Sequence, residues 1–297
     1  MTKKINLAIP IAGKSKRFIE RGFNTHKAFL DLDKGFVLKN IIDTFPKDVF
    51  RPIIVCTKEQ EKEYKSYLDL IKKNYPDLYV KSINSHNFGP TYSLRQLEVQ
   101  DESPFVVHYC DFLVDMNYEP MVRGLREGLI YAPYFRGFHP ASLGSTTFAY
   151  MKLNSNKMLI TLKEKSSFTD NRIEEPCSTG IYAFPSFGIF KDLADELLNN
   201  PDQWGQKEAY TSLCMNLAVE KGYRVFCNEV SKFICLGTPR DYEEYLFWNK
   251  QFNNFYRPSE NQFIFDNHVL TAAGKGSRFR KYGYRIPKIF LDFQNQS

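Results

Sequence analysis

The sequence lacks the features that mark several common classes of protein. No apolar stretch approaches the roughly 18 residues that a membrane-spanning helix needs. No block of about 5–8 lysines and arginines occurs, so there is no arm of the kind that binds nucleic acid. The chain also has no C-x-x-C pair, no zinc-type ligand spacing and no G-x-S-x-G elbow. These absences argue against a membrane protein, a nucleic-acid-binding protein, a zinc protein and a serine hydrolase.

The few cysteines are scattered along the chain, several of them in apolar runs typical of strands. Isolated thiols of this kind are typical of proteins from a reducing compartment. We therefore expect reduced, mostly buried thiols in a cytoplasmic protein. The cysteines are Cys56, Cys110, Cys177, Cys214, Cys227 and Cys235.

Length and charge are compatible with an α/β protein that acts on small molecules. The 297 residues fit two domains, or one α/β domain of about 250 residues. Hydrophobic residues make up 43% and charged residues 25%, an ordinary globular balance. The net charge of +6 suits phosphorylated small molecules as partners, and it equally describes a slightly basic surface.

Strand-like and helix-like segments alternate through the first half of the chain. Apolar, β-branched runs predict buried parallel strands, and apolar residues at helical spacing predict the helices between them. This alternation predicts a doubly wound, mostly parallel sheet. The predicted strands are 5–12, 51–57, 78–83 and 104–115, and the predicted helices are 18–21, 36–44, 58–74, 92–99 and 118–129.

The second half is more mixed and includes a predicted hairpin at residues 154–156. The sheet as a whole is therefore expected to be mixed. The predicted strands are 145–153, 157–164, 178–184, 223–228 and 232–236, and the predicted helices are 187–199, 209–221 and 239–252.

A long-range repeat divides the chain. Residues 9–32 recur as residues 270–293 without gaps, and a period of this length corresponds to a whole domain. We predict a domain at 1–252, a linker at 253–262 and the truncated start of a second copy at 263–297. The chain would then be the front part of a longer tandem protein, or one cut inside its second copy. The identical positions of the first copy are Ala12, Gly13, Lys14, Arg17, Phe18, Gly22, Lys27, Phe29, Leu30 and Asp31.

The repeated segment has a strand, then A-G-x-G-x-R-F, then P-K, and it resembles the sugar-phosphate nucleotidyltransferase family. The match is good in the second copy, from Ala273 to Arg278 with Pro287-Lys288. The first copy departs from the pattern at Ser15 and His26. Its Thr25-His26-Lys27 is similar to phosphocholine cytidylyltransferase-type members, so nucleotidyl transfer is better supported than a sugar acceptor.

The resemblance implies a Rossmann-like nucleotidyltransferase fold with a β subdomain that binds the acceptor. A glycine-rich turn after the first strand lets backbone N–H groups approach a polyphosphate, and the helix that follows adds positive potential. Ala12, Gly13, Lys14 and Ser15 are the expected nucleotide-binding residues of this turn. Arg17 and Lys27 would give charge-assisted hydrogen bonds to the triphosphate.

Further landmarks follow in the family's order. Gly89 and Thr91 fall in the segment that resembles the nucleobase site, and Asp111 resembles the carboxylate that binds Mg²⁺. The expected acceptor-site residues are Glu164, Lys165, Gly180 and Thr238, with Lys165 on the acceptor phosphate. Many members have a second metal-binding aspartate where this chain has Cys235, and a thiol is a poor Mg²⁺ ligand.

Several of these residues also have a purely structural interpretation. Asp111 could cap the next helix, the Glu164-Lys165 pair could be a solvated surface, and Gly180 could be a bulge glycine. Thr238 with the proline after it is typical of a helix start. The histidines lack ligand spacing and favour structural roles.

We therefore expect an enzyme that moves a nucleotidyl group from a nucleoside triphosphate to a phosphorylated acceptor and releases pyrophosphate. By resemblance, the acceptor is a sugar 1-phosphate or a phosphorylated amino alcohol or polyol, destined for a capsule or other surface glycan. Mg²⁺ is the expected cofactor, no nucleic acid or membrane is expected as a partner, and a homo-oligomer is possible. One alternative is a degenerate domain that binds a nucleotide or sugar without turnover. A third hypothesis is that residues 268–288 dock onto another chain, which truncation at about residue 258 would test.

Overall fold

The computed structural model describes residues 4–137, 148–204, 208–255, 274 and 276–282. A seven-stranded sheet runs through its centre, with the strand order β14-β8-β13-β6-β1-β4-β5. β6, β1, β4 and β5 are parallel, and β13 runs antiparallel between β6 and β8, so the sheet is mixed as expected. The strands are β1 (Ile5–Pro10), β4 (Phe50–Thr57), β5 (Tyr79–Ile83), β6 (Phe105–His108), β8 (Ile130–Tyr131), β13 (Ile181–Phe184) and β14 (Val225–Phe226).

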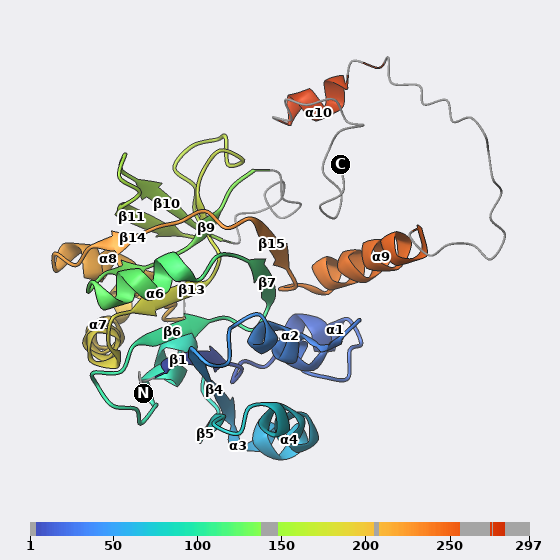
Figure 1. Cartoon of the computed structure of the whole chain (residues 1–297), viewed down its shortest axis with the longest axis horizontal. Helices are drawn as coiled ribbons and strands as arrows, with labels where there is room; N and C mark the ends of the chain where they lie inside the picture. Colours follow the sequence, from blue (N-terminus) through green and yellow to red (C-terminus); the bar gives the residue numbers. More distant parts are fainter. Residues whose placement is uncertain (1–3, 138–147, 205–207, 256–273, 275, 283–297) are drawn as a thin grey trace.

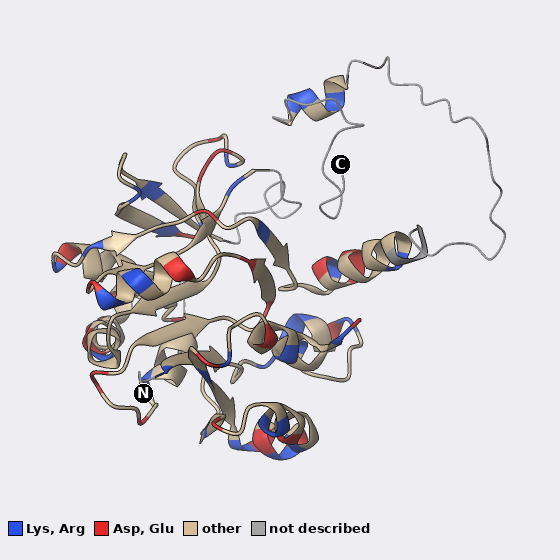
Figure 2. Ribbon diagram, in the orientation of Figure 1, with Lys and Arg blue, Asp and Glu red and all other residues tan. Residues whose placement is uncertain are grey.

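Helices cover both faces of this sheet, which confirms the doubly wound α/β architecture (Figure 1). Apolar residues of α2 (Val37–Asp43), α4 (Lys65–Asn74) and α6 (Glu119–Arg126) form the core on one face. Residues of α5 (Pro90–Arg95), α7 (Phe187–Asn199) and α8 (Leu213–Glu220) fill the core on the other face. β1 and β6 are buried along their length and carry no charged residue, whereas the outer helices carry charges of both signs (Figure 2).

The chain reverses its direction across the sheet between β1 and β6. From β1 it proceeds through β4 to β5 on one side, and it then crosses back so that β6 lies on the other side of β1. The loops that leave the carboxyl ends of β1 and β6 therefore diverge and leave a crevice between them. In open α/β sheets, such a crevice is where ligands bind.

A second, smaller sheet lies beside the central one (Figure 1). Its four strands are antiparallel in the order β11-β10-β12-β9, and the predicted hairpin at residues 154–156 joins β10 to β11. The predicted strand 145–153 begins within residues 138–147, which lie outside the described residues. The strands are β9 (Tyr134–Phe135), β10 (Ala149–Leu153), β11 (Leu159–Glu164) and β12 (Cys177–Ser178).

The prediction of one strand over 104–115 is wrong. The chain forms β6, leaves the sheet at residues 109–111 and then forms β7 (Phe112–Asp115), which pairs with β15 (Lys232–Cys235) in a separate two-stranded sheet. Tyr109 N–H still donates to the Gly180 carbonyl in the register of β6, and the chain then turns away, so that the Asp111 carbonyl accepts from Leu236 N–H. Residues 109–111 are thereby placed at the carboxyl edge of the central sheet.

Other predicted elements are shorter or divided. The helix expected over 58–74 breaks at Tyr64 into α3 (Lys58–Glu63) and α4, because the Tyr64 ring stacks on Phe29 and its hydroxyl accepts from His26 N–H. The strand expected over 178–184 is interrupted at Gly180, whose φ is 92°. The helix expected over 209–221 begins only at Leu213, and the strand expected over 223–228 shrinks to β14. Among the described residues, no helix is both long and apolar enough to cross a membrane.

The last long helix of the first copy reaches into the predicted linker. α9 (Pro239–Phe255) continues three residues past the predicted boundary at 252 and points away from the sheets in Figure 1. Most of the predicted second copy lies outside the described residues, so the division into domains stays a prediction. Two short helices do occupy matching places in the repeat, α1 (Lys16–Glu20) and α10 (Ser277–Lys281). Each follows a left-handed residue, Ser15 with φ 47° and Gly276 with φ 59°.

Candidate active site

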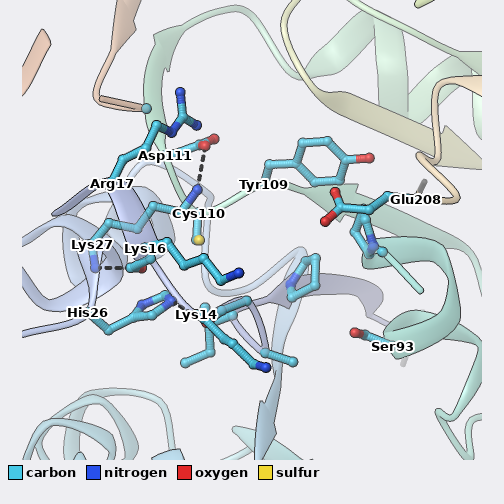
Figure 3. Close-up of a pocket in the computed structure, with 18 of the residues that line it drawn as sticks. Lys14, Lys16, Arg17, His26, Lys27, Ser93, Tyr109, Cys110, Asp111 and Glu208 are labelled. Atoms are coloured by element: carbon cyan, nitrogen blue, oxygen red, sulfur yellow. Dashed lines mark hydrogen bonds and ion pairs between the residues drawn. The ribbon is translucent and has the colours of Figure 1, made fainter. Parts of the chain in front are cut away.

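A cavity of about 410 Å³ opens at the carboxyl edge of β1 and β6, where the chain reverses (Figure 3). Segments far apart in the sequence line it, namely the loop after β1, the turn before α5, the break between β6 and β7, and residues near 208–210. The predicted site residues that line it are Ala12, Gly13, Lys14, Ser15, Arg17, Lys27, Gly89 and Asp111. The structure therefore brings eight sequence-predicted residues together at one place.

The loop after β1 supplies positive charge and free backbone donors. Figure 3 shows Lys14, Lys16 and Arg17 on one side of the cavity. Among the described residues, the backbone N–H groups from Ala12 to Ser15 have no acceptor. A Cβ built on Gly13 would meet no atom within 4 Å. This arrangement offers a polyanion both backbone N–H groups and side-chain cations.

Lys27 and Asp111 form an ion pair at the edge of the cavity, with Nζ 2.6 Å from Oδ2. Burial alone would lower the pKa of Lys27, but the neighbouring carboxylate raises it above its usual value. Burial alone would raise the pKa of Asp111, but Lys27 and then Arg17 hold it below its usual value. Both side chains are therefore charged at neutral pH, and the carboxylate is a hard oxygen ligand of the type that Mg²⁺ takes.

Cys235 lies near this carboxylate, at the position where the family pattern has its second aspartate. A Cβ built on Gly237 would lie 3.5 Å from both Asp111 Oδ2 and Cys235 Sγ. The thiol donates to Asp241, 3.5 Å away, and its pKa is raised by burial and by the carboxylates of Asp241 and Asp111. A protonated thiol is a poor ligand for a hard cation. The described residues contain no group of three or more metal-ligating side chains.

The turn before α5 pairs with the segment before α8 and closes the opposite end of the cavity. Ala209 N–H donates to the Phe88 carbonyl at 2.9 Å, and Thr91 N–H donates to the Ala209 carbonyl at 3.2 Å. Gly89 has φ 93°, and a Cβ there would lie 2.8 Å from Ala209 N. Thr91 is fully buried and its hydroxyl contacts Thr211, so it lies behind the cavity lining rather than in it.

The His86 ring and the Ser93 hydroxyl add a polar corner beside Gly89. His86 Nδ1 accepts from Phe88 N–H at 3.1 Å, so the ring proton resides on Nε2, 2.8 Å from Ser93 Oγ. Because Ser93 accepts that proton, its own O–H can donate, and no acceptor for it occurs among the described residues. Both residues line the cavity. This corner can therefore donate a hydrogen bond to a ligand.

The predicted acceptor residue Lys165 reaches the cavity through Tyr210. Its Nζ donates to Tyr210 Oη at 2.9 Å, and Tyr210 in turn donates to Glu208 Oε2 at 2.7 Å. Tyr210 and Glu208 line the cavity. Figure 3 shows Glu208 across from the lysines of the loop after β1. Glu164 is held by the Ser212 hydroxyl, and burial raises its pKa.

Two other predicted residues have well-defined structural contacts outside the cavity lining. A Cβ on Gly180 would lie 3.0 Å from the Phe112 ring, and this glycine separates β12 from β13. Thr238 forms a capping box at the start of α9, where its hydroxyl accepts from Asp241 N–H and its own N–H donates to the Asp241 carboxylate. Both agree with the structural interpretation of these residues.

Sequence reasoning missed several residues that line the cavity. Tyr109 and Cys110 stand next to Asp111, and that adjacency was a usable signal. The sequence gave no signal for Glu208 and Tyr210. Their place at the cavity depends on the pairing of residues 88–91 with Ala209, which are more than a hundred residues apart in sequence.

Comparison with known proteins bears on the fold and the family. A family model described as nucleotidyl transferase matches residues 13–246. No curated protein matches the chain. The nucleoside-diphosphate-sugar pyrophosphorylase from Vibrio cholerae is similar at a TM-score of 0.67 and 18% identity, over 81% of this chain and 99% of that one.

Two further solved structures show the same likeness. A UDP-glucose pyrophosphorylase complexed with UDP-glucose has a TM-score of 0.64 at 13% identity, over 84% of this chain and 100% of that one. The inositol-1-phosphate CTP transferase from T. maritima has a TM-score of 0.58 at 14% identity, over 83% of this chain and 96% of that one. At these identities the likeness shows a shared fold.

Proposed function

Because the chain belongs to the nucleotidyl transferase family, we propose that its cavity holds a nucleoside triphosphate and a phosphorylated acceptor and that the protein transfers the nucleotidyl group between them. One observation carries the proposal, namely that three features meet in one cavity at the reversal point of the sheet. These are the backbone N–H groups of the loop after β1 that have no acceptor among the described residues, the cations Lys14, Lys16 and Arg17, and the Lys27–Asp111 ion pair. That combination suits a polyphosphate and its counter-cation.

The reaction that fits this site is an in-line displacement at phosphorus. An oxygen of the acceptor phosphate forms a bond to the α-phosphorus, the bond from that phosphorus to the α,β-bridging oxygen breaks, and pyrophosphate leaves with the electron pair. No proton must be removed from an ionised phosphate, so the site needs no catalytic base. Positioning and electrostatic stabilisation carry such a step.

The cations on the loop side have the role of holding the triphosphate and offsetting its charge. Lys14, Lys16 and Arg17 line the cavity where the pyrophosphate part would lie, and Figure 3 shows the Arg17 guanidinium beside the Asp111 carboxylate that pairs with Lys27. Charge that develops on the leaving oxygen is stabilised most by donors already fixed in place. Lys27 is fixed by its ion pair and by its backbone N–H, which donates to Ser15 Oγ at 3.2 Å.

Asp111 fits the role of a Mg²⁺ ligand. Its carboxylate is ionised, partly exposed and at the cavity, and a Mg²⁺ that takes one carboxylate completes its shell with phosphate oxygens and water. When bound, the ion would supply charge neutralisation to the phosphates. Cys235 leaves the described site with one such carboxylate rather than two.

The acceptor would bind on the side of Lys165, Tyr210 and Glu208. Lys165 offers an ammonium donor to a phosphate, Tyr210 holds that ammonium in place, and Glu208 offers an acceptor to hydroxyl or ammonium groups. These chemistries suit a sugar 1-phosphate or a phosphorylated amino alcohol or polyol, in precursor synthesis for a surface glycan. Two structural relatives are described as sugar-nucleotide pyrophosphorylases and one as an inositol-1-phosphate CTP transferase, which supports an acceptor of the sugar or polyol kind.

A binding module without turnover is the second candidate, and the observation that favours it is Cys235. A thiol where the family pattern has a carboxylate weakens the hold on a metal ion. A degenerate first copy would bind nucleotide through the same loop and leave the chemistry to another domain.

A pyrophosphate-release assay separates these two functions. The protein is incubated with Mg²⁺, each of ATP, CTP, GTP and UTP, and a panel of phosphorylated acceptors. We expect pyrophosphate from at least one pair and its loss in Asp111→Asn. Asp115→Asn, four residues along and outside the cavity lining, should keep full activity. Tight nucleotide binding with no pyrophosphate from any pair would favour the binding module.

A further inference from the structure

The carbonyl oxygen of Gly13 accepts two hydrogen bonds from side chains on different elements. Gln60 Nε2 lies 2.9 Å from it, and His26 Nε2 lies 3.1 Å from it. Gln60 belongs to α3, 47 residues further along, and is not among the residues that line the cavity. Two side chains from beyond this loop, one of which lines the cavity and one of which does not, therefore hold the Gly13 peptide.

His26 is a hydrogen-bond donor because its neutral ring carries the proton on Nε2. Its Nδ1 accepts from Ala28 N–H at 3.1 Å, so the ring proton is on Nε2 and is donated to the Gly13 carbonyl. Burial first, and then the Lys27 charge, lower the pKa of His26 to about 3. The ring therefore stays neutral, with this tautomer, throughout the neutral pH range.

Gln60 has its other end fixed as well. Its Oε1 accepts from Thr57 N–H at 2.8 Å, and Thr57 Oγ1 accepts from Gln60 N–H at 3.2 Å, which makes a capping box at the start of α3. The amide nitrogen is left to donate to Gly13. This side chain therefore ties the end of β4 to the loop after β1.

The planarity of the peptide bond turns this contact into an orientation. In a trans peptide the carbonyl and the N–H of the next residue point to opposite sides. Holding the Gly13 carbonyl toward Gln60 and His26 therefore fixes the Lys14 N–H on the other side. That N–H has no acceptor among the described residues, and Lys14 lines the cavity.

We propose that Gln60 and His26 are positioning residues that hold the Gly13 peptide so that the N–H groups of the loop face a bound triphosphate. The proposal rests on the function proposed above. It gives a role to a residue outside the cavity and explains why a histidine stands where the second copy has Pro287, which has no such donor. Neither side chain would touch the reacting atoms.

Two variants of one capping box provide the test. Gln60→Met removes the donor to Gly13, whereas Thr57→Val breaks the cap and leaves the Gln60 side chain able to donate. Binding of inorganic tripolyphosphate and of each nucleoside triphosphate is measured by calorimetry, and KM and kcat are measured by pyrophosphate release. We expect Gln60→Met to weaken tripolyphosphate binding and to raise KM for the nucleotide roughly five- to tenfold, the size of one lost hydrogen bond. Its kcat should stay within about twofold.

The outcomes distinguish positioning from mere stability, and this proposal from the function. Equal losses of affinity in Thr57→Val and Gln60→Met, or none in Gln60→Met, would overturn the positioning role. His26→Phe, which keeps an aromatic ring beside Phe29 and Tyr64, should raise KM in the same direction. Wild-type protein that binds tripolyphosphate but releases no pyrophosphate would contradict the proposed nucleotidyl transfer. The positioning role of Gln60 would still be tested by the tripolyphosphate affinities of Gln60→Met and Thr57→Val.

Discussion

At the scale of single residues, no described neighbour and no backbone angle requires position 13 to be a glycine. It does not adopt a left-handed backbone, and a Cβ there would project into open space at the cavity. A glycine in that setting makes room for something outside the chain. The repeat predicted its importance, and the open space at its Cβ position supports the proposed close approach of a ligand rather than the geometry of a turn.

Gly13→Ala is therefore expected to separate stability from binding. The free energy of unfolding should stay the same or rise by up to about 1 kcal/mol, because alanine restricts the unfolded chain. The affinity for nucleotide should fall at least tenfold, because the new methyl group takes the space of the phosphates. Urea unfolding and nucleotide calorimetry measure the two effects. Gly124→Ala on α6, where a Cβ would make ordinary contacts of 3.7 Å, is the control and should change neither binding nor fold.

Cys235→Asp is expected to create the second carboxylate that the first copy lacks. The new group would stand near Asp111 and Asp241, so the protein should be less stable without metal and should recover when metal binds. Mn²⁺ affinity, measured by electron paramagnetic resonance, should rise about tenfold as the ligand changes from a thiol to a hard oxygen. The neutral variant Cys235→Asn should show no such rise. Equal affinities in the two variants would place position 235 outside the metal's reach.

At the scale of elements, the sequence predicted what local pattern controls and missed what distant pairing controls. β1 and β4 were predicted correctly because continuous apolar runs mark buried parallel strands. The break after β6 was missed because apolar residues resume at Phe112 directly after Asp111, while the hydrogen bond that holds Asp111 after the break comes from the distant Leu236. That break places Asp111 at the sheet edge. The segment whose strand was predicted wrongly is therefore the segment that supplies the carboxylate of the cavity.

The pairing of the turn before α5 with Ala209 makes Gly89→Ala a test of element packing. Both the left-handed backbone of Gly89 and the 2.8 Å approach to Ala209 N oppose a side chain, so we expect a loss of roughly 2–3 kcal/mol in unfolding free energy. Gly128→Ala has the same kind of backbone, at φ 77°, with no atom near its Cβ. It should lose only about 1 kcal/mol. The difference between the two variants in unfolding free energy, measured with urea, gives the cost of the contact with Ala209. Equal losses would show that this contact costs nothing.

At the scale of the whole molecule, two buried histidines link the site to stability. Burial lowers the pKa of His26 to about 3 and that of His108 to about 4. His26 holds the loop after β1, and His108 lies at the end of β6, stacked on Phe112. The sequence favoured structural roles for these rings, and it gave no sign that His26 would line the cavity.

The protein is therefore expected to lose stability as the pH falls below about 6.5. Each folded-state pKa is lower than the unfolded value, so the unfolded chain binds more protons in this window and acid favours unfolding. Between the unfolded pKa and the folded pKa, each ring should contribute about 1.4 kcal/mol per pH unit. Urea unfolding at pH 7.5, 6.0 and 5.0 gives the slope. His108→Phe keeps the stack on Phe112 and should remove about half of that slope, and an unchanged slope would exclude His108 as a source.

The ion pair between Lys27 and Asp111 means that the cavity carries its own counterion. A divalent cation that coordinates Asp111 must compete with the ammonium group of Lys27, and a polyphosphate that takes Lys27 must release the carboxylate. Each exchange alone breaks the ion pair, but together they give both charges a new partner. By thermodynamic linkage, the cation and the polyphosphate must then raise each other's affinity by the same factor. The site would therefore have a low affinity for the cation alone and for the polyphosphate alone. Its affinity would be highest for the chelate of the two.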